Sequence, residues 1–133
     1  MITKRRSQGL PPYLHASLLP AYIAGAAFRP LSAEDLQLYV EPWIGVIGQA
    51  AFYRQIAQMD QKFTDEIEPL YGKLPFTTRL IWGEQDQWIP LAQGVRLADM
   101  LKVDEFVRVP GAGHLVQEDA PEAIMAVLAT PDR

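Results

Sequence analysis

Hydrophobic residues in the first half of the chain recur at spacings of three and four positions, and runs of β-branched residues are absent up to about Leu74. This pattern is typical of amphipathic helices. Ser32, followed three positions later by Asp35, has the form of a capping box and predicts a helix that runs toward Pro42. A second helix is predicted over residues 47–59, where an apolar stripe recurs at helical spacing.

The second half of the chain has a different pattern, in which short apolar runs alternate with helical spacing. Residues 77–82 (TTRLIW) and 105–109 (EFVRV) predict two strands, each followed by a glycine or a proline. Residues 90–102 predict the helix between them. Two strands joined by a helical crossover of this length form a parallel, right-handed βαβ unit. Asp119 as N-cap and Pro121 in the first turn predict a final helix.

Composition limits the chemistry that this chain can perform. It has 133 residues, 49% of them hydrophobic, which is enough to bury a core without disulfide bonds. With no cysteine and two histidines, the chain lacks a thiolate nucleophile and is a poor candidate for a metal site. A net charge of -4 leaves no basic surface for phosphate groups. We expect no nucleic-acid partner, no membrane association, no metal and no cofactor.

The order of residues near the start is similar to that of a secretory signal, because a basic cluster, residues 4–6, precedes an apolar stretch, residues 14–28. His15 and Pro20 interrupt this stretch, however. The longest apolar runs also fall short of the ~20 residues that a membrane-spanning helix needs. We therefore expect a cytoplasmic protein.

Two residues suited to acid–base chemistry follow the predicted strands. Asp86 lies in the loop after the first strand (GEQDQWIP), and His114 lies in the loop after the second (PGAGHLVQED). The carboxyl ends of parallel strands share one edge of a sheet, and neighbouring strands are ~4.8 Å apart, so the carboxylate can reach the imidazole. Such a pair fixes the imidazole tautomer and stabilises the imidazolium, as a general base requires.

Residues 74–128 resemble the C-terminal end of the α/β-hydrolase superfamily. In that superfamily a strand–G-x-x-D loop carries the acid of the catalytic triad, and a G-x-G-H loop after the last strand carries the histidine. Residues 82–86 (WGEQD) and 111–114 (GAGH) match these motifs in the order that the family uses. The resemblance implies that Asp86 is the catalytic acid and His114 the catalytic base.

The resemblance also implies an α/β fold class, as a partial α/β-hydrolase fold. Residues 1–74 are similar to the helical cap that these enzymes insert before the acid-bearing strand. Residues 75–133 would form the C-terminal βαβα part of the sheet, with parallel strands.

The family's nucleophile elbow, G-x-S-x-G or its aspartate variant, is absent from the sequence. The only serines are Ser7, Ser17 and Ser32, and none has the flanking glycines of that motif. The chain therefore resembles the C-terminal half of a hydrolase, whether as a cut or misassigned reading frame or as a diverged protein. We expect the isolated chain to be inactive.

Two functions are compatible with these motifs. The first is hydrolysis of an ester, carbon–halogen or carbon–carbon bond, with the nucleophile supplied from elsewhere; epoxide hydrolase and haloperoxidase-like chemistry stay open as well. The alternative is a non-catalytic binding or assembly module derived from the same fold. Whether the chain is an enzyme is left undecided by the sequence.

Aromatic residues suggest a pocket for a small apolar substrate, lined by Trp88, Trp43, Phe52 and Tyr53, although aromatic stripes at helical spacing are more often core residues. His15 has no evident partner in the sequence, which favours a structural or solvated role.

Assembly is predicted from the edge of the first strand, which would pair on only one side within this chain. An unpaired apolar edge is prone to association. We therefore expect a homodimer or an association with a missing N-terminal half.

Overall fold

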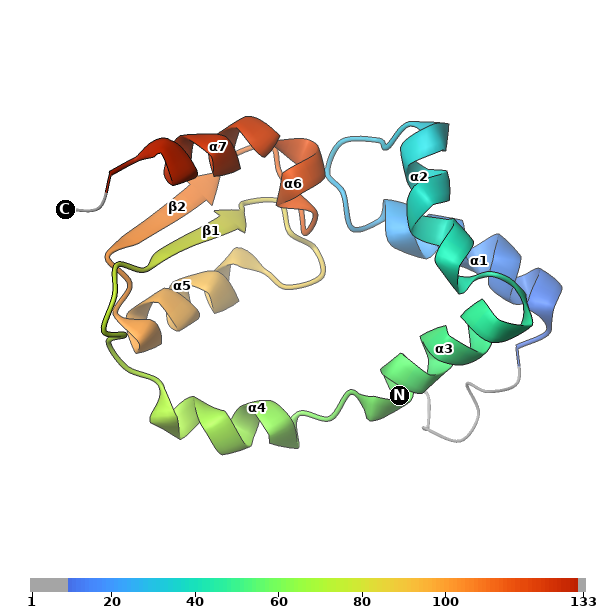
Figure 1. The fold of residues 1–133 in the computed structure, drawn as a ribbon, viewed down its shortest axis with the longest axis horizontal. Helices are drawn as coiled ribbons and strands as arrows, with labels where there is room; N and C mark the ends of the chain where they lie inside the picture. Colours follow the sequence, from blue (N-terminus) through green and yellow to red (C-terminus); the bar gives the residue numbers. More distant parts are fainter. Residues whose placement is uncertain (1–9, 132–133) are drawn as a thin grey trace. The chain divides into compact units, whose positions relative to one another are not determined.

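The computed structural model describes residues 10–131, which form two compact units. One unit contains residues 10–24 and 31–66, and the other contains residues 25–30 and 67–131. The first unit is helical, and the second holds the strands (Figure 1).

The first unit contains three helices of eight or more residues, and residues 25–30 between the first two belong to the second unit. The three helices are α1 (Pro12–Ala24), α2 (Ala33–Val40) and α3 (Gly45–Gln58), with the 3-10 turn η2 (Glu41–Trp43) between α2 and α3. The helix start predicted at Ser32 is confirmed: Ser32 is the N-cap of α2, and its hydroxyl accepts a hydrogen bond from Asp35 N at 3.1 Å. α2 ends before Pro42, which cannot donate to the preceding turn. Helix α4 (Lys62–Ile67) and the 3-10 turn η3 (Glu68–Leu70) follow.

His15 lies inside the first unit and is only 3% exposed. Its Nε2 is 2.8 Å from the carbonyl oxygen of Trp43, which can only accept, so Nε2 carries the proton. Nδ1 then accepts from the Tyr53 hydroxyl at 3.2 Å, and burial raises the pKa of that hydroxyl. His15 therefore has a structural position. The assumption that it lacks a partner is wrong, because both partners are distant in the sequence.

The second unit has a two-stranded parallel sheet with helices on both faces. Strand β1 (Arg79–Gly83) pairs with β2 (Glu105–Val109) in a register that runs from Arg79↔Glu105 to Gly83↔Val109. Helix α5 (Leu91–Leu101) connects them, which confirms the predicted βαβ unit. The predicted bounds of β2 are confirmed, whereas β1 begins two residues later than predicted.

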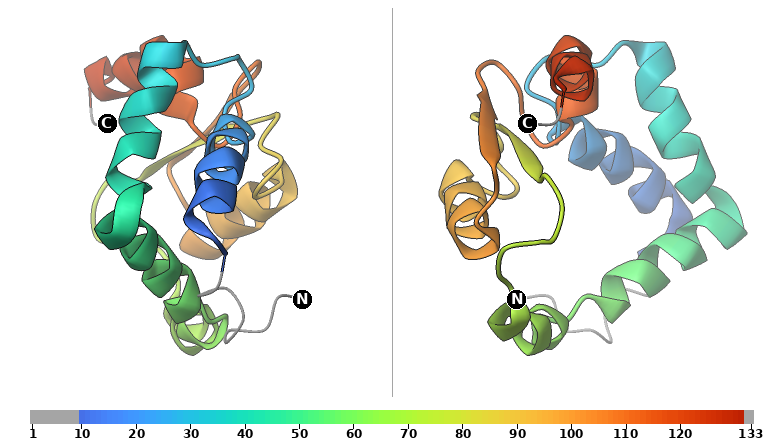
Figure 2. Two further views of the ribbon diagram at one scale, coloured as in Figure 1. Left: turned by 90° about the vertical axis from the view of Figure 1, so that its right-hand side faces the viewer. Right: turned by 60° about the vertical axis from the view of Figure 1, so that its left-hand side comes forward.

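Alternate residues of β1 point to opposite faces of the sheet, which decides where the helices pack. Trp82 lies against Gly94 of α5, where a side chain on the glycine would meet the indole at 2.6 Å. Ile81, on the other face, packs on the small core of the unit, together with Ala123 of α7 (Pro121–Ala129). Figure 2 shows α5 and α7 on opposite sides of the strands.

The end of the chain corrects one prediction. Asp119 is not the N-cap of the last helix: it is the last residue of a separate short helix, α6 (Val116–Asp119), and Ala120 occupies the cap position. Pro121 is in the first turn of α7, as predicted. The Asp119 side chain is turned inward and 1% exposed, because it hydrogen-bonds to other segments of the unit.

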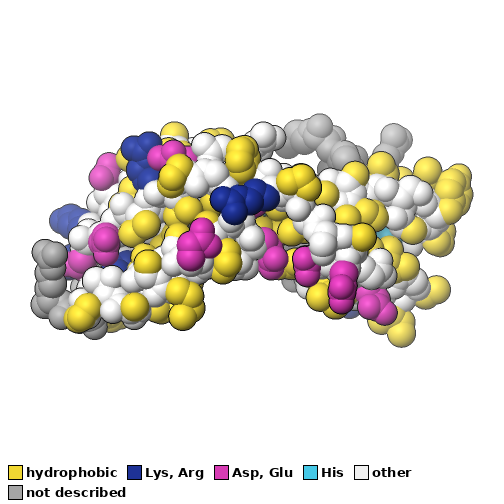
Figure 3. Space-filling view, turned by 90° about the horizontal axis from the view of Figure 1, so that it is seen from above, with side chains coloured by type: hydrophobic (Ala, Val, Ile, Leu, Met, Phe, Trp, Pro, Cys, Tyr) yellow, Lys and Arg dark blue, Asp and Glu magenta, His cyan; other side chains and the backbone are white. Residues whose placement is uncertain are grey.

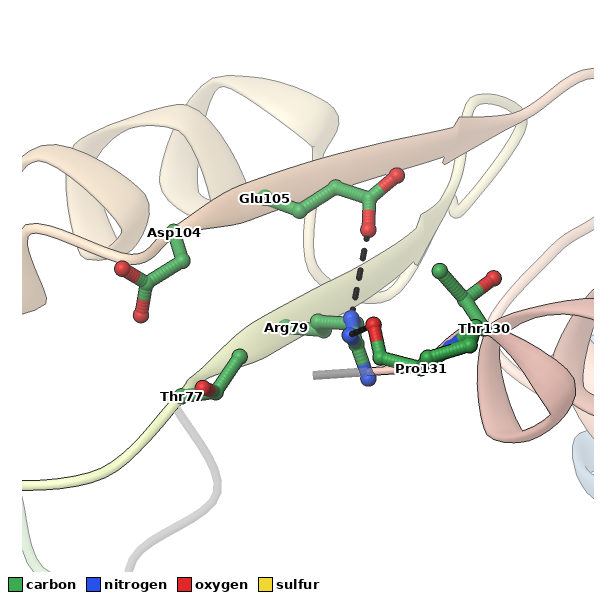
Figure 4. A pocket seen from close by; sticks show the side chains of 6 residues that line it. All are labelled: Thr77, Arg79, Asp104, Glu105, Thr130 and Pro131. Carbon is green, nitrogen blue, oxygen red and sulfur yellow. Dashed lines mark hydrogen bonds and ion pairs between the residues drawn. The ribbon is translucent and has the colours of Figure 1, made fainter. Parts of the chain in front are cut away.

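Arg79 joins the amino ends of both strands to Pro131, which follows the last helix (Figure 4). Its guanidinium donates to the carbonyl oxygen of Pro131 at 3.0 Å and lies 3.4 Å from the Glu105 carboxylate. These residues border an open cavity of about 420 Å³. Beside it, a hydrogen bond from the Lys73 ammonium lowers the pKa of the Asp104 carboxyl.

Within residues 10–131, neither strand has a partner on its outer edge. Large apolar side chains are also exposed, for example Val46 and Ile47 at 88% and 85%, and the face drawn in Figure 3 carries many hydrophobic side chains. Association through these surfaces stays a prediction. No helix of the described part of the chain is long and apolar enough to cross a bilayer.

Candidate active site

The loop after β1 holds the Asp86 carboxylate in one position. The chain turns directly after Gly83, and the Asp86 oxygen Oδ1 accepts hydrogen bonds from the backbone N–H groups of Trp88 and Ile89, both at 2.9 Å. Aspartate favours such turns because its short side chain can accept from the backbone two and three residues on. The other oxygen, Oδ2, is left to face the loop after β2.

His114 lies across from that oxygen. Its Nδ1 is 2.9 Å from Asp86 Oδ2, so the predicted contact between the two side chains is present. A carboxylate accepts hydrogen bonds, which places the proton on Nδ1 and leaves Nε2 with a free lone pair. None of the residues that the structure describes hydrogen-bonds to Nε2, and the His114 side chain is 33% exposed. Nε2 is therefore available to an external proton donor.

Trp88 covers part of the imidazole. The centroids of the Trp88 and His114 rings are 5.1 Å apart, and the ring planes are inclined by 33°. The backbone of Trp88 also binds Asp86, so one residue contacts both members of the pair. The Asp86 side chain is 5% exposed, so its hydrogen bond to His114 is largely shielded from water, which strengthens it.

Close contact between the two loops brings Asp86 and His114 together. A Cβ atom on Gly83 would lie 2.2 Å from the carbonyl oxygen of Gly113, and this is too short for any side chain. The glycine that ends β1 therefore allows the second loop to pass directly over it.

Gln85 holds the same loops together, and sequence reasoning did not identify it. Its side-chain oxygen accepts from Gly111 N at 2.6 Å, and its backbone N–H donates to the Ala112 carbonyl at 2.9 Å. A glutamine in a turn carries no local signal for this role, because both partners lie on the other loop.

The remaining aromatic residues of the predicted pocket belong to the first unit. Trp43, Phe52 and Tyr53 pack around one another and around His15, with ring centroids 5.2 to 5.9 Å apart. Phe52 and Tyr53 also border an apolar cavity of about 200 Å³. Trp88 belongs to the second unit, and a shared substrate pocket stays a prediction.

Asp119 is a further residue at the site that the sequence did not reveal. Its Oδ2 accepts from the backbone N–H groups of Phe28 and Gly113, at 2.8 and 2.7 Å. Its Oδ1 accepts from Arg29 N at 2.7 Å. Phe28 and Arg29 are about ninety positions away in the sequence, so no local pattern could reveal these contacts. Among the described residues, no group of three potential metal ligands lies together.

Comparisons with known proteins identify the family and the fold. The sequence matches the alpha/beta hydrolase family over residues 3–127. The structure is similar to an alpha/beta hydrolase fold protein from Burkholderia ambifaria, with 50% identity and a TM-score of 0.89, over 96% of this chain and 47% of that one. No match is found among curated protein sequences.

A second solved structure shares the fold at lower identity. It is a variant of the meta-cleavage product hydrolase CumD, with 20% identity and a TM-score of 0.65, over 85% of this chain and 44% of that one. The chain thus spans about half the length of both structures.

Proposed function

The chain belongs to the alpha/beta hydrolase family, and we propose that Asp86 and His114 form the acid and base of its catalytic triad. The observation that carries this proposal is the 2.9 Å hydrogen bond from His114 Nδ1 to Asp86, with Nε2 left open. The reaction would be hydrolysis of an ester, carbon–halogen or carbon–carbon bond in a small apolar substrate. The apolar ring of Trp88 beside the base supports that choice of substrate.

In the proposed mechanism, His114 Nε2 accepts a proton from the attacking hydroxyl group or water as the new bond forms. The imidazole becomes positively charged, and Asp86 stabilises this charge across the Nδ1 hydrogen bond. The Asp86 side chain is 5% exposed, so water screens the attraction only weakly. His114 then returns the proton to the leaving group.

The nucleophile is proposed to come from outside residues 1–133, because the sequence has no G-x-S-x-G elbow. The hydrogen-bond donors that stabilise the oxyanion would come from the same missing part of the fold. In support, the chain aligns with only 47% of the similar Burkholderia protein.

We therefore expect no acyl-enzyme when the purified chain alone is mixed with an activated aryl ester. A base without a nucleophile can only activate water, and the absent oxyanion donors are each worth ~10²–10³ in rate. The measurement is stopped-flow release of the aryl alcohol, with mass spectrometry of the protein. A stoichiometric burst that His114→Ala abolishes would show that the chain contains its own nucleophile.

A further inference from the structure

We propose that Asp119 is a positioning residue that holds the backbone of His114 in place, so that the imidazole can reach Asp86. This inference rests on the proposed function of the Asp86–His114 pair. It assigns a role to a buried carboxylate that takes no part in the proton transfer itself.

The surroundings of Asp119 show that it binds backbone rather than a cation. The side chain is 1% exposed, and both of its oxygens accept from main-chain N–H groups. None of the ion pairs among the described residues includes it. Hydrogen bonds to a charged acceptor are stronger than those between neutral groups, and burial makes the loss of the acceptor costly.

One of these bonds acts directly on the catalytic loop. Asp119 Oδ2 accepts from Gly113 N, the residue immediately before His114. Because Gly113 and Asp119 are six positions apart, this bond closes the loop that carries His114. The loop cannot open without breaking it.

The other bonds bring a second segment against the same loop. Phe28 N and Arg29 N donate to Asp119, and in return Ala26 O accepts from His114 N at 2.8 Å and from Leu115 N at 3.2 Å. Residues 25–30 are therefore joined to the loop at four points. His114 contributes one of them with its own backbone N–H.

Gly113 shows how closely the two segments are packed. A Cβ atom there would lie 2.8 Å from Ala26 O and 2.9 Å from Phe28 N. His114 is thus held by two carboxylates with different tasks: Asp86 bonds to its ring, and Asp119 bonds to the main chain of the residue before it.

The two histidines of the chain provide a spectroscopic test that needs no activity. Ring ¹⁵N shifts distinguish a proton on Nδ1 from one on Nε2. We expect His114 to carry its proton on Nδ1 and His15, bound to the Trp43 carbonyl, to carry it on Nε2. His15 therefore serves as an internal control, and His114→Ala assigns the signals.

Asp119→Ala removes the acceptor, and Asp119→Asn is the milder variant, which keeps the shape but replaces one accepting oxygen by a donor. In both, we expect His114 to lose its preference for Nδ1–H while His15 is unchanged. Amide exchange at Phe28, Arg29 and Gly113 should accelerate, by roughly tenfold or more as the local structure opens. Circular dichroism establishes that each variant is folded.

Two control variants separate the possible outcomes. Asp86→Asn should shift the His114 tautomer but leave amide exchange at residues 28, 29 and 113 slow. Glu122→Gln, which replaces an exposed carboxylate of α7, should change neither the tautomer nor the exchange rates. If His114 keeps Nδ1–H in both Asp119 variants, the positioning role is wrong. If the unsubstituted chain lacks an Nδ1–H form of His114, the Asp86–His114 pair itself is contradicted. The positioning role of Asp119, which rests on that pair, is then wrong as well.

Discussion

His114→Ala is expected to remove nearly all hydrolysis from a complex of this chain with the N-terminal half of a related hydrolase. That half would supply the early strands and the nucleophile elbow, and it would pair with the outer edge of β1. All three catalytic loops then leave the same edge of the sheet, so the nucleophile comes within reach of His114 Nε2. The measurement is kcat of the co-purified complex on an activated ester.

In the same complex, Asp86→Asn should lower kcat on the order of 10⁴-fold. The asparagine amide can present an N–H to Nδ1, which forces the proton onto Nε2 and removes the lone pair that accepts the nucleophile's proton. The backbone bonds from Trp88 and Ile89 can be kept by the remaining amide oxygen, so the loop itself should change little.

Glu122→Gln is the matched control, because it neutralises an exposed carboxylate of the same unit. It should leave kcat unchanged. Activity that survives His114→Ala in an intact complex would contradict the triad assignment and favour a non-catalytic binding or assembly module.

The second large effect concerns stability. Gly83→Ala should lower the free energy of unfolding by about 2–3 kcal/mol, as overpacking in a closely packed site does. The added methyl group would lie 2.2 Å from Gly113 O and 2.5 Å from Ala112 O. Both are backbone atoms, so relief requires the loops that carry Asp86 and His114 to separate. Urea denaturation followed by circular dichroism measures the change.

Gly72→Ala is the control for this substitution, because a Cβ atom there has no neighbour within 4 Å. It should be neutral or stabilise by about 0.4–1 kcal/mol, since alanine restricts the unfolded chain. A Gly83→Ala variant as stable as Gly72→Ala would show that the two loops do not approach as closely as described.

Local pattern was sufficient to predict the framework of the fold. The Ser32 cap and the bounds of β2 are each decided by residues near one another in the chain, and the helical crossover between the two strands predicts their parallel pairing. The contact between Asp86 and His114 was predictable too, although the residues are 28 positions apart, because parallel strands bring their following loops to one edge.

The partners of buried polar groups could be decided only by the tertiary structure. Locally, Asp119 before Ala120 and Pro121 has the pattern of an N-cap, and the sequence prediction relied on that pattern. In the folded unit, the buried carboxylate instead accepts from the N–H groups of Phe28, Arg29 and Gly113, which folding brings around it.

His15 shows the same difference between what the local sequence predicts and what the tertiary structure decides. It lies on α1, and its two hydrogen-bond partners are 28 and 38 positions away in the sequence. Hydrophobic periodicity and capping patterns arise from neighbours along the chain, so they can be read in the sequence. A buried polar atom bonds to whichever donor or acceptor folding brings beside it, and that depends on segments far apart in the sequence.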